Sequence, residues 1–368
     1  MDTPAKSLAH FLIAVAALVL LAAVLNFVVD PLQLFRPAQF YRPMYSNDSR
    51  MQNAGLIRSQ SFDTVFMGTS LAIHFRQSDI DRVIGGRSLK LSMSGSTSHE
   101  QSFVLAAALE RHPRRVIWQM DDWIFRDAPE VDSDIYLPVD LYRRNLKGIA
   151  EYLFSGATAC ESLFMLAHST PPLERTMARL ASFFAVTFPI DNPDQINVLE
   201  ADFTVGDHYN AGRAMAAFAD DTSPERRASL ADGYQYDSMV RNFERDTVEL
   251  INRNPNTRFD IYFPPYSILQ FVAMRDSSPT TLKIVYDFTA YISQRLAQLP
   301  NVSLYDFRIA KEVTHNLNNY ADTVHHSPEV DLKILSWIAE RKFVVDRATP
   351  LTSLNQLKAQ TEAYSVVR

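Results

Sequence analysis

The stretch that decides the fold reads FDTVFMGTS and runs from Phe62 to Ser70. Its β-branched and aromatic residues predict a buried strand at Thr64–Met67. Gly68 then permits a tight turn that a Cβ atom would crowd. Such a turn can present the Ser70 hydroxyl at the carboxyl end of the strand, where open α/β sheets place their reactive groups.

A second motif, near the other end of the chain, reads Asp322-Thr323-Val324-His325. It supplies an acid and a base three residues apart, and together with Ser70 it offers a nucleophile, a general base and a group to orient that base. Each motif alone is common, because Gly-x-Ser occurs in many turns and Asp-x-x-His fits one helical turn with a capping Asp. The occurrence of both motifs in this order in one chain is much rarer than that of either motif alone.

In this order of motifs the chain resembles the SGNH (GDSL-like) hydrolase superfamily. In that family the nucleophilic serine follows the first strand, and the last block carries Asp-x-x-His. The resemblance therefore implies that Ser70 is the nucleophile, His325 the general base and Asp322 the group that orients it. It covers residues 60–126 and 255–340.

A run of small residues, Ser92–Ser98, follows the second predicted strand. The second block of the family places a glycine amide at this point, so the resemblance implies that Gly95 and Ser70 form the oxyanion hole through their backbone amides. The alternative is that the serines only cap the helix predicted at Glu100–Arg111.

The third block departs from the family, because Asp121 and Asp122 stand where an asparagine usually donates to the oxyanion. An ionised carboxylate only accepts hydrogen bonds and would repel a developing oxyanion. The departure resembles the membrane-tethered polysaccharide-acetylation and D-alanyl-transfer proteins more than the soluble esterases.

Three residues are speculative contacts to a substrate. Asp122 follows the third strand, and Tyr266 lies in a diproline turn at the end of the fourth. Tyr266 either lines an acceptor pocket or packs inside the fold. His326 is a candidate acceptor contact, whereas the Asp-x-x-His spacing selects its neighbour His325 as the base.

The N-terminal stretch Phe11–Val29 is apolar except for Asn26. Nineteen residues at 1.5 Å each extend about 28 Å, close to the hydrocarbon thickness of a bilayer. Asp30-Pro31 ends the stretch, since proline cannot continue a helix. We interpret it as a signal anchor; the alternatives are a cleaved signal peptide and a buried core helix.

The position of this anchor predicts where the rest of the chain lies. Lys6 precedes the apolar stretch while Arg36 and Arg42 follow it, so the positive-inside bias is weak. We expect a single-pass protein of a bacterial inner membrane, with its catalytic domain in the periplasm.

Composition limits the remaining possibilities. The chain has 368 residues, which is enough for one large domain or two modest ones. Of these residues 47% are hydrophobic, and the net charge is −6. A nucleic-acid partner would require a clustered basic face, and the sequence shows no sign of one. The lone Cys160 cannot form an internal disulfide, and no second Cys or well-spaced His accompanies it as a metal ligand. The sequence predicts no metal and no cofactor.

Periodicity predicts an α/β fold, namely a three-layer α/β/α sandwich with a parallel sheet. Strands are expected at 64–67, 88–91, 116–120, 259–263 and 302–305. Helices are expected at 78–84, 100–111, 141–154, 160–168, 173–184, 234–252, 281–299 and 329–340.

The expected organisation has four parts and one insertion. They are the cytoplasmic tip and anchor (1–30), an extended tether with several prolines (31–60), the SGNH-like domain (61–345) with a helical insertion (about 127–256), and a polar tail (346–368).

The resemblance implies acyl transfer through a covalent intermediate on Ser70. The membrane anchor favours an O-acyltransferase, with acetyl as the expected group, acting on a cell-surface or exported polysaccharide beside a multi-spanning membrane acyltransferase. One alternative is a carbohydrate esterase with the same triad, in which water is the acceptor. The other is a non-catalytic scaffold or glycan-binding subunit, which the missing asparagine favours and the intact triad opposes.

Overall fold

The chain divides into two compact units. The first comprises Met1–Gln60 with Asp132–Ile196, and the second comprises Ser61–Val131 with Asn197–Arg368. Part of the predicted insertion therefore belongs to the unit that contains the N-terminus. The computed structural model describes residues 4–41, 45, 48–127, 137–143, 145–169, 208–223 and 233–366.

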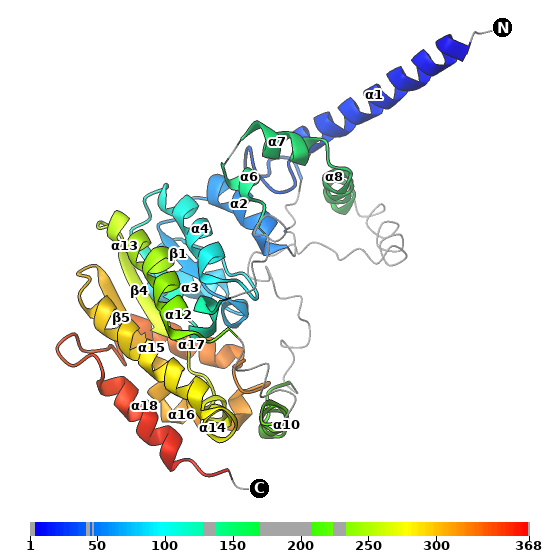
Figure 1. The fold of residues 1–368 in the computed structure, drawn as a ribbon. Coiled ribbons are helices and arrows are strands. Elements are labelled where there is room, and N and C mark those ends of the chain that lie inside the picture. The colour runs from blue at the N-terminus through cyan, green and yellow to red at the C-terminus, as the bar shows by residue number, and fades with distance from the viewer. Residues whose placement is uncertain are drawn as a thin grey trace. The chain divides into compact units, whose positions relative to one another are not determined.

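Within the described residues, the second unit contains a five-stranded parallel sheet with the strand order β2-β1-β3-β4-β5 (Figure 1). This confirms the predicted α/β class and parallel sheet. Nearly every strand residue is buried, as expected of a parallel sheet covered on both faces, including the polar Ser88 and Lys90 of β2. The strands are β1 (Thr64–Met67), β2 (Ser88–Lys90), β3 (Arg115–Gln119), β4 (Arg258–Phe263) and β5 (Val302–Asp306).

The strand order reverses direction at β1. The chain moves outward from β1 to β2 and then crosses back to β3 on the other side of β1. In open α/β sheets the crevice at such a reversal, beside the carboxyl ends of the strands, is the preferred place for a ligand site. Ser70 comes shortly after β1 and Asp121 shortly after β3, so both lie at this edge of the sheet.

Helices connect the strands of the second unit. Two of the described helices of this unit begin with proline, Pro279 and Pro328, at the first helical position, where its missing N–H costs little. The helices are α3 (Gln77–Ile84), α4 (Ser98–Leu109), α10 (Ala211–Asp221), α12 (Tyr236–Phe243), α13 (Glu249–Arg253), α14 (Ile268–Ser277), α15 (Pro279–Ala297), α16 (Lys311–Thr314), α17 (Pro328–Ala339) and α18 (Thr352–Ala363).

One apolar cluster joins the sheet to α17. Phe66 of β1, Ile117 of β3 and Tyr262 of β4 are fully buried in it together with Val330 and Ile334 of α17. Full burial of each such side chain stabilises the fold by about 1.5–3 kcal/mol relative to leaving it exposed. The helix that follows His325 is therefore fixed against the strands that lead to Ser70 and Asp121.

The predicted extended tether contains a helix instead, α2 (Ser49–Ser59). Asp48 caps it by accepting hydrogen bonds from the amides of Arg50 and Met51, at 3.0 and 3.3 Å. Gln52 is fully buried and donates to the Leu32 carbonyl at 3.3 Å. The polar composition suggested a solvated linker, but these polar groups find their partners inside the first unit.

The helix predicted at 141–154 is two helices, α6 (Val139–Arg143) and α7 (Leu146–Leu153). The break lies at Asn145, whose side chain caps α7 by accepting from the Gly148 amide at 2.8 Å. The helix predicted at 173–184 lies outside the described residues.

The polar tail also holds a helix, α18, which the sequence did not signal. Its Leu354 and Leu357 are buried, and Arg275 of α14 donates to the Thr361 and Tyr364 carbonyls at 2.6 and 2.9 Å. Contacts with α14, rather than the local pattern, hold this helix in place.

The helix predicted at 234–252 is interrupted by a π-helical turn. The turn covers Glu244–Val248, between α12 and α13. Such turns insert one residue into a helix and often occur at functional sites. Here the turn carries the buried Asp246.

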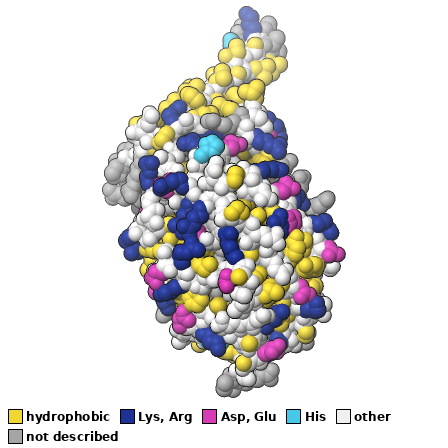
Figure 2. Space-filling model, turned by 90° about the vertical axis from the view of Figure 1, so that its left-hand side faces the viewer, with side chains coloured by type: hydrophobic (Ala, Val, Ile, Leu, Met, Phe, Trp, Pro, Cys, Tyr) yellow, Lys and Arg dark blue, Asp and Glu magenta, His cyan; other side chains and the backbone are white. Residues whose placement is uncertain are grey.

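The first unit begins with α1 (Pro4–Val29), an apolar helix. Its segment Lys6–Val29 contains an 18-residue window with a mean hydropathy of 2.9 and is long and apolar enough to cross a membrane. Hydrophobic side chains cover its surface (yellow, top of Figure 2). The helix ends before Asp30, as predicted, and Asp30 has a left-handed φ of 54°.

The end of α1 is held by the helices that follow it. In the Asn26 side chain, Nδ2 donates to the Leu153 carbonyl at 2.8 Å and Oδ1 accepts from the Ser162 hydroxyl at 3.1 Å. The buried Asp30 carboxylate accepts from the Leu34 amide and the Tyr152 hydroxyl, at 2.9 and 3.0 Å. The last turns of α1 are therefore part of the fold of the first unit.

These contacts predict how truncation affects the chain. The full chain should remain with membranes after a carbonate wash. A variant that starts at Ala22 keeps Asn26 and should retain the thermal stability of the first unit in mild detergent, whereas a variant that starts at Pro31 should lose it. Circular dichroism melting and sedimentation measure both effects. Release of the intact full chain by carbonate, or equal melting of the two truncated variants, would contradict this account.

Candidate active site

Ser70, His325 and Asp322 form one hydrogen-bonded series. Ser70 is the first residue of a short 3-10 turn, Ser70–Ala72, after β1. Its Oγ lies 3.0 Å from Nε2 of His325, and Nδ1 of the same ring lies 2.6 Å from Oδ2 of Asp322. The two motifs at opposite ends of the sequence thus meet in the geometry of a nucleophile, a base and an orienting carboxylate.

The Asp322 carboxylate fixes both the loop and the imidazole. Its Oδ1 accepts from the Val324 and His325 amides, each at 2.7 Å. Burial acts to raise the pKa of Asp322, but the hydrogen bonds from the His325 ring and these amides outweigh it and lower the pKa. An ionised carboxylate only accepts, so Nδ1 of His325 carries the proton that faces Asp322. Nε2 is then the ring atom that can accept the Ser70 proton.

The series is accessible from solvent. The side chains of His325 and Asp322 retain 21% and 32% of their exposure, and Ser70 is half-buried. Solvent therefore reaches all three side chains.

Gln119 explains why glycine precedes the serine turn. A Cβ on Gly68 would lie 2.4 Å from Oε1 of Gln119 and 2.5 Å from Cβ of Ala72. The same Oε1 accepts from the Thr69 amide at 3.1 Å. The prediction that Gly68 allows a turn too crowded for a Cβ is confirmed. Sequence reasoning missed Gln119, whose only signal is a polar residue at the end of an apolar strand.

Asp121 joins three turns at the carboxyl edge of the sheet. Its Oδ2 accepts from the Thr69 hydroxyl and from the Gln119 amide, both at 2.7 Å, and its Oδ1 accepts from the Tyr266 hydroxyl. Burial raises the pKa of Asp121 to about 6 against the opposing effect of these donors. The carboxylate is therefore engaged inside the protein, where it positions the turn that carries Ser70.

The turn that contains Gly95 is tied to the end of β1. The Met93 amide donates to the Gly68 carbonyl at 3.0 Å. Gly95 has a left-handed φ of 62°, and a Cβ added to it would meet nothing within 4 Å. The cap of α4 is Thr97, so the preceding serines are not needed for that role. Among the described residues, the amides of Ser70 and Gly95 donate no hydrogen bond, which suits both for an oxyanion.

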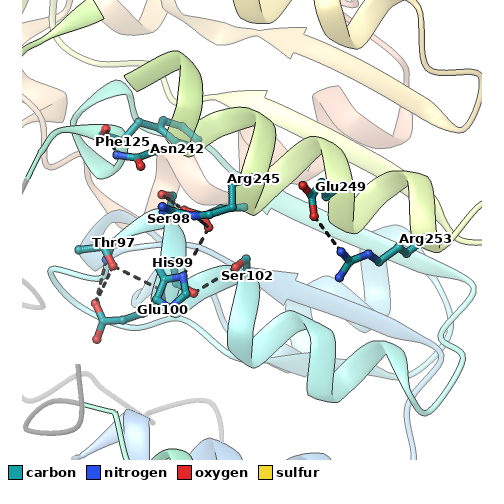
Figure 3. A network of polar contacts seen from close by, with 11 residues as sticks. Thr97, Ser98, His99, Glu100, Ser102, Phe125, Asn242, Arg245, Glu249 and Arg253 are labelled. Carbon is teal, nitrogen blue, oxygen red and sulfur yellow. Dashed lines mark hydrogen bonds and ion pairs between the residues drawn. The ribbon is translucent and has the colours of Figure 1, made fainter. Parts of the chain in front are cut away.

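A polar network anchors the start of α4 just after this turn (Figure 3). The Ser98 hydroxyl donates to Asp246 at 2.6 Å, Arg245 binds the same carboxylate at 2.7 Å, and Nδ1 of His99 lies 3.4 Å from it. Although burial alone would raise it, hydrogen bonds from Arg245, His99 and Ser98 lower the pKa of Asp246. Sequence reasoning missed Asp246, because nothing in its local pattern marks the π-helical turn.

The three speculative substrate contacts all have partners or places inside the fold. Tyr266 is 4% exposed, which supports packing over the lining of a pocket. His326 is 3% exposed, and its Nδ1 lies 3.2 Å from Oδ1 of Asp331 without hydrogen-bond geometry. Asp122 is half-buried and accepts from the Tyr234 hydroxyl at 2.9 Å; burial raises its pKa.

A cavity of about 210 Å³ lies between the segments that follow Ser70 and His325. Burial and, to a lesser degree, the positive charges of His326, His325 and Lys90 lower the pKa of its lining residue His74 to about 4. The cavity is lined by His74, Phe75, Arg76, Asp79, Pro328, Glu329, Asp331, Leu332 and Leu335.

A larger cavity, about 680 Å³, lies away from this chemistry. Its lining includes Arg258 and Val302, the first residues of β4 and β5. It is therefore at the amino ends of these strands, opposite to the edge that carries Ser70. The smaller cavity is lined by the segments that follow Ser70 and His325, although Ser70, His325 and Asp322 are not among its lining residues. Within the described residues no group of three or more His, Cys, Asp or Glu could hold a metal ion.

No protein-family model matches the chain, and no curated protein matches it significantly. Its function therefore has to be inferred from its own residues and their geometry.

The crowding at Gly68 predicts a large effect for a small change. Gly68→Ala should lower the free energy of unfolding by about 1–3 kcal/mol, the usual cost of overpacking, and should displace Ser70. Gly156→Ala is the matched control, because a Cβ there meets nothing within 4 Å. Urea denaturation measures both. Equal free energies of unfolding for the two variants would show that the Gln119 side chain moves aside at little cost.

The buried Asp121 predicts a pH dependence of stability. Its pKa is about 6 in the folded chain against an ordinary value of 3.8, so between these values only the unfolded chain loses the proton. Stability should therefore fall as pH rises through this window, by about 3 kcal/mol in all. Asp121→Asn should remove this fall, as measured by the difference between the wild-type and variant free energies of unfolding at each pH.

Asp246→Asn provides a control of opposite sign. Because the pKa of Asp246 is lowered, its carboxylate contributes stability that is gained as pH rises, and the variant should lose that gain. Parallel pH curves for wild type and Asp121→Asn would contradict the assignment.

Proposed function

We propose that this chain is a membrane-anchored O-acyltransferase that works through an acyl-enzyme on Ser70. The observation that carries the proposal is the series Ser70–His325–Asp322, with distances of 3.0 and 2.6 Å. We further propose that the fold is a three-layer α/β/α sandwich of the SGNH type, with the parallel sheet as its middle layer.

The first half of the reaction forms the acyl-enzyme. The Ser70 Oγ attacks an ester carbonyl while Nε2 of His325 takes the hydroxyl proton. The imidazolium is stabilised by Asp322, whose lowered pKa keeps it ionised. The Ser70 and Gly95 amides receive the oxyanion. The intermediate then expels the alcohol of the donor, which takes the proton from His325, and the acyl group remains on Ser70.

The second half transfers the acyl group to a hydroxyl. A sugar hydroxyl loses its proton to Nε2 of His325 and attacks the acyl carbonyl, and His325 returns the proton to Ser70. An acceptor that is held in place can outcompete water through its effective concentration. The cavity beside the series is our candidate for holding it. Its lining residue Asp331 is buried, and neither carboxylate oxygen makes a hydrogen bond among the described residues.

The apolar α1 supports a location at a membrane. We propose a single-pass protein of a bacterial inner membrane, with the Ser70 site in the periplasm, an exported or cell-surface polysaccharide as the acceptor and acetyl as the group transferred. A multi-spanning membrane acyltransferase would supply the acyl group from the other side.

A carbohydrate esterase is the second candidate. The partial exposure of His325 and Asp322 favours it, since water can reach the acyl-enzyme. The hydrogen-bonded series weighs against a scaffold without catalysis, because its geometry serves proton transfer.

Active-site substitutions test the chemistry. Ser70→Ala and His325→Ala should each lower acyl release from an artificial acetyl ester by several orders of magnitude, and the losses should not add, since the residues act as a unit. Ser336→Ala is the control, because within the part of the chain that the structure describes its hydroxyl bonds only to the Leu332 carbonyl of its own helix. Mass spectrometry of the intact protein should detect acetyl on Ser70.

The acceptor is identified by the product. With a suitable oligosaccharide, mass spectrometry should show an acetylated sugar in place of free acetate. Acetate release with no gain of mass on any glycan would favour the esterase. A folded chain whose Ser70 is never acylated by any ester donor would contradict both enzymes.

A further inference from the structure

The helix α8 (Gly156–His168) has one face against α1 and one apolar face exposed. On the packed face, Ser162 donates to Asn26 at 3.1 Å, and Met165 is buried with Val29 in one apolar cluster. The position of α8 beside the end of α1 is visible in Figure 1. The two helices are parts of the same compact unit.

Four exposed apolar residues lie on α8 or just before it. Ala157, Cys160 and Leu163 are in the helix, where successive residues three apart are neighbours and together cover an arc of about 120°. Phe154 lies in the turn before the helix; it is 53% exposed, and Leu163 is 51% exposed. We call these four residues the apolar foot. The only charged side chain among the described side chains of α8 is the half-buried Glu161.

The length of α1 indicates what covers the foot. Residues 6–21 are exposed at every position, and buried positions begin at Ala23. Sixteen residues extend about 24 Å, which is less than the hydrocarbon thickness of about 30 Å. A span that starts at Lys6 must therefore continue to about Leu25. The bilayer then reaches the level at which α8 packs on Asn26 and Val29.

A second feature marks the same level as the membrane interface. Arg36 donates to the Val28 carbonyl at 3.0 Å, and its guanidinium lies 4.7 Å from the centre of the Phe27 ring. Basic and aromatic side chains gather where a span meets the headgroups, and a long cationic side chain can extend to that region.

We propose that α8 is a second, non-spanning membrane contact and that the apolar foot lies at the boundary between headgroups and acyl chains. The occupant is lipid, because the foot continues the lipid-facing surface of α1 at a depth fixed by the length of that helix. The foot carries no basic residue, so burial of apolar surface drives the contact and anionic lipid is not required. Two contacts would hold the first unit at a fixed tilt on the bilayer. This inference does not depend on the proposed acyl transfer.

Cys160 provides the test, because it is the one cysteine of the sequence and lies in the foot. The full chain is labelled at Cys160 with an environment-sensitive fluorophore and reconstituted into phosphatidylcholine vesicles. We expect blue-shifted emission that brominated lipids quench. A chain with Cys160→Ser and Gln356→Cys, which carries the label at an exposed position of α18, should emit as in water and resist this quenching.

A matched pair of substitutions tests the contribution of the foot. Leu163→Asp should reduce the lipid quenching at Cys160 several-fold, because a carboxylate opposes insertion. Leu332→Asp places the same charge at an exposed leucine of α17 and should leave the quenching unchanged. Thermal melting checks that both variants are folded.

Two results would overturn the proposal. Water-like emission without lipid quenching in the folded chain would show that the foot faces solvent. Blue-shifted emission that brominated lipids do not quench would identify a protein occupant, either another segment of this chain or a second copy. A disulfide between the Cys160 residues of two chains under mild oxidation would point to the second copy.

Discussion

The buried carboxylate of Asp121 is the constraint on which the candidate site depends. A carboxylate inside a sheet edge is costly unless donors surround it, and here Thr69, Gln119 and Tyr266 supply them. Thr69 and Tyr266 lie in the turns after β1 and β4, Gln119 is the last residue of β3, and Asp121 itself lies in the turn after β3. Satisfying this one carboxylate therefore aligns three loops. The turn after β1 carries Ser70. Asp121 thus acts on the candidate site through the protein framework, by holding the turn that carries Ser70.

The hydrophobic core performs the complementary task of bringing together residues that are 255 positions apart. The His325 loop has little regular structure of its own, yet α17 follows it directly and is buried against β1, β3 and β4 through Val330 and Ile334. The Asp322 carboxylate then organises the loop by accepting two backbone amides. Apolar packing therefore sets the position of the imidazole, and local hydrogen bonds set its orientation.

Sequence reasoning predicted the parts of the fold that have a local signal. The strands are apolar runs, Gly68 marks a crowded turn, and the spacing of Asp322 and His325 fits one short loop. It failed where tertiary contacts decide the outcome. A single Gln119 within a strand, or the buried Asp246 in a π-helical turn, has no local signature. The helix α2 was missed because its polar residues resemble a solvated linker until their buried partners are known.

The polar residue within the apolar N-terminal stretch shows the same principle. Asn26 interrupts a segment that lipid would otherwise surround, and an unpaired amide in hydrocarbon is costly. Its donors and acceptor are instead bonded to Leu153, Ser155 and Ser162 of the first unit. The same turns of α1 therefore end the apolar helix and begin the folded unit. These bonds fix the orientation of α1 relative to the rest of the first unit, which a flexible tether could not do.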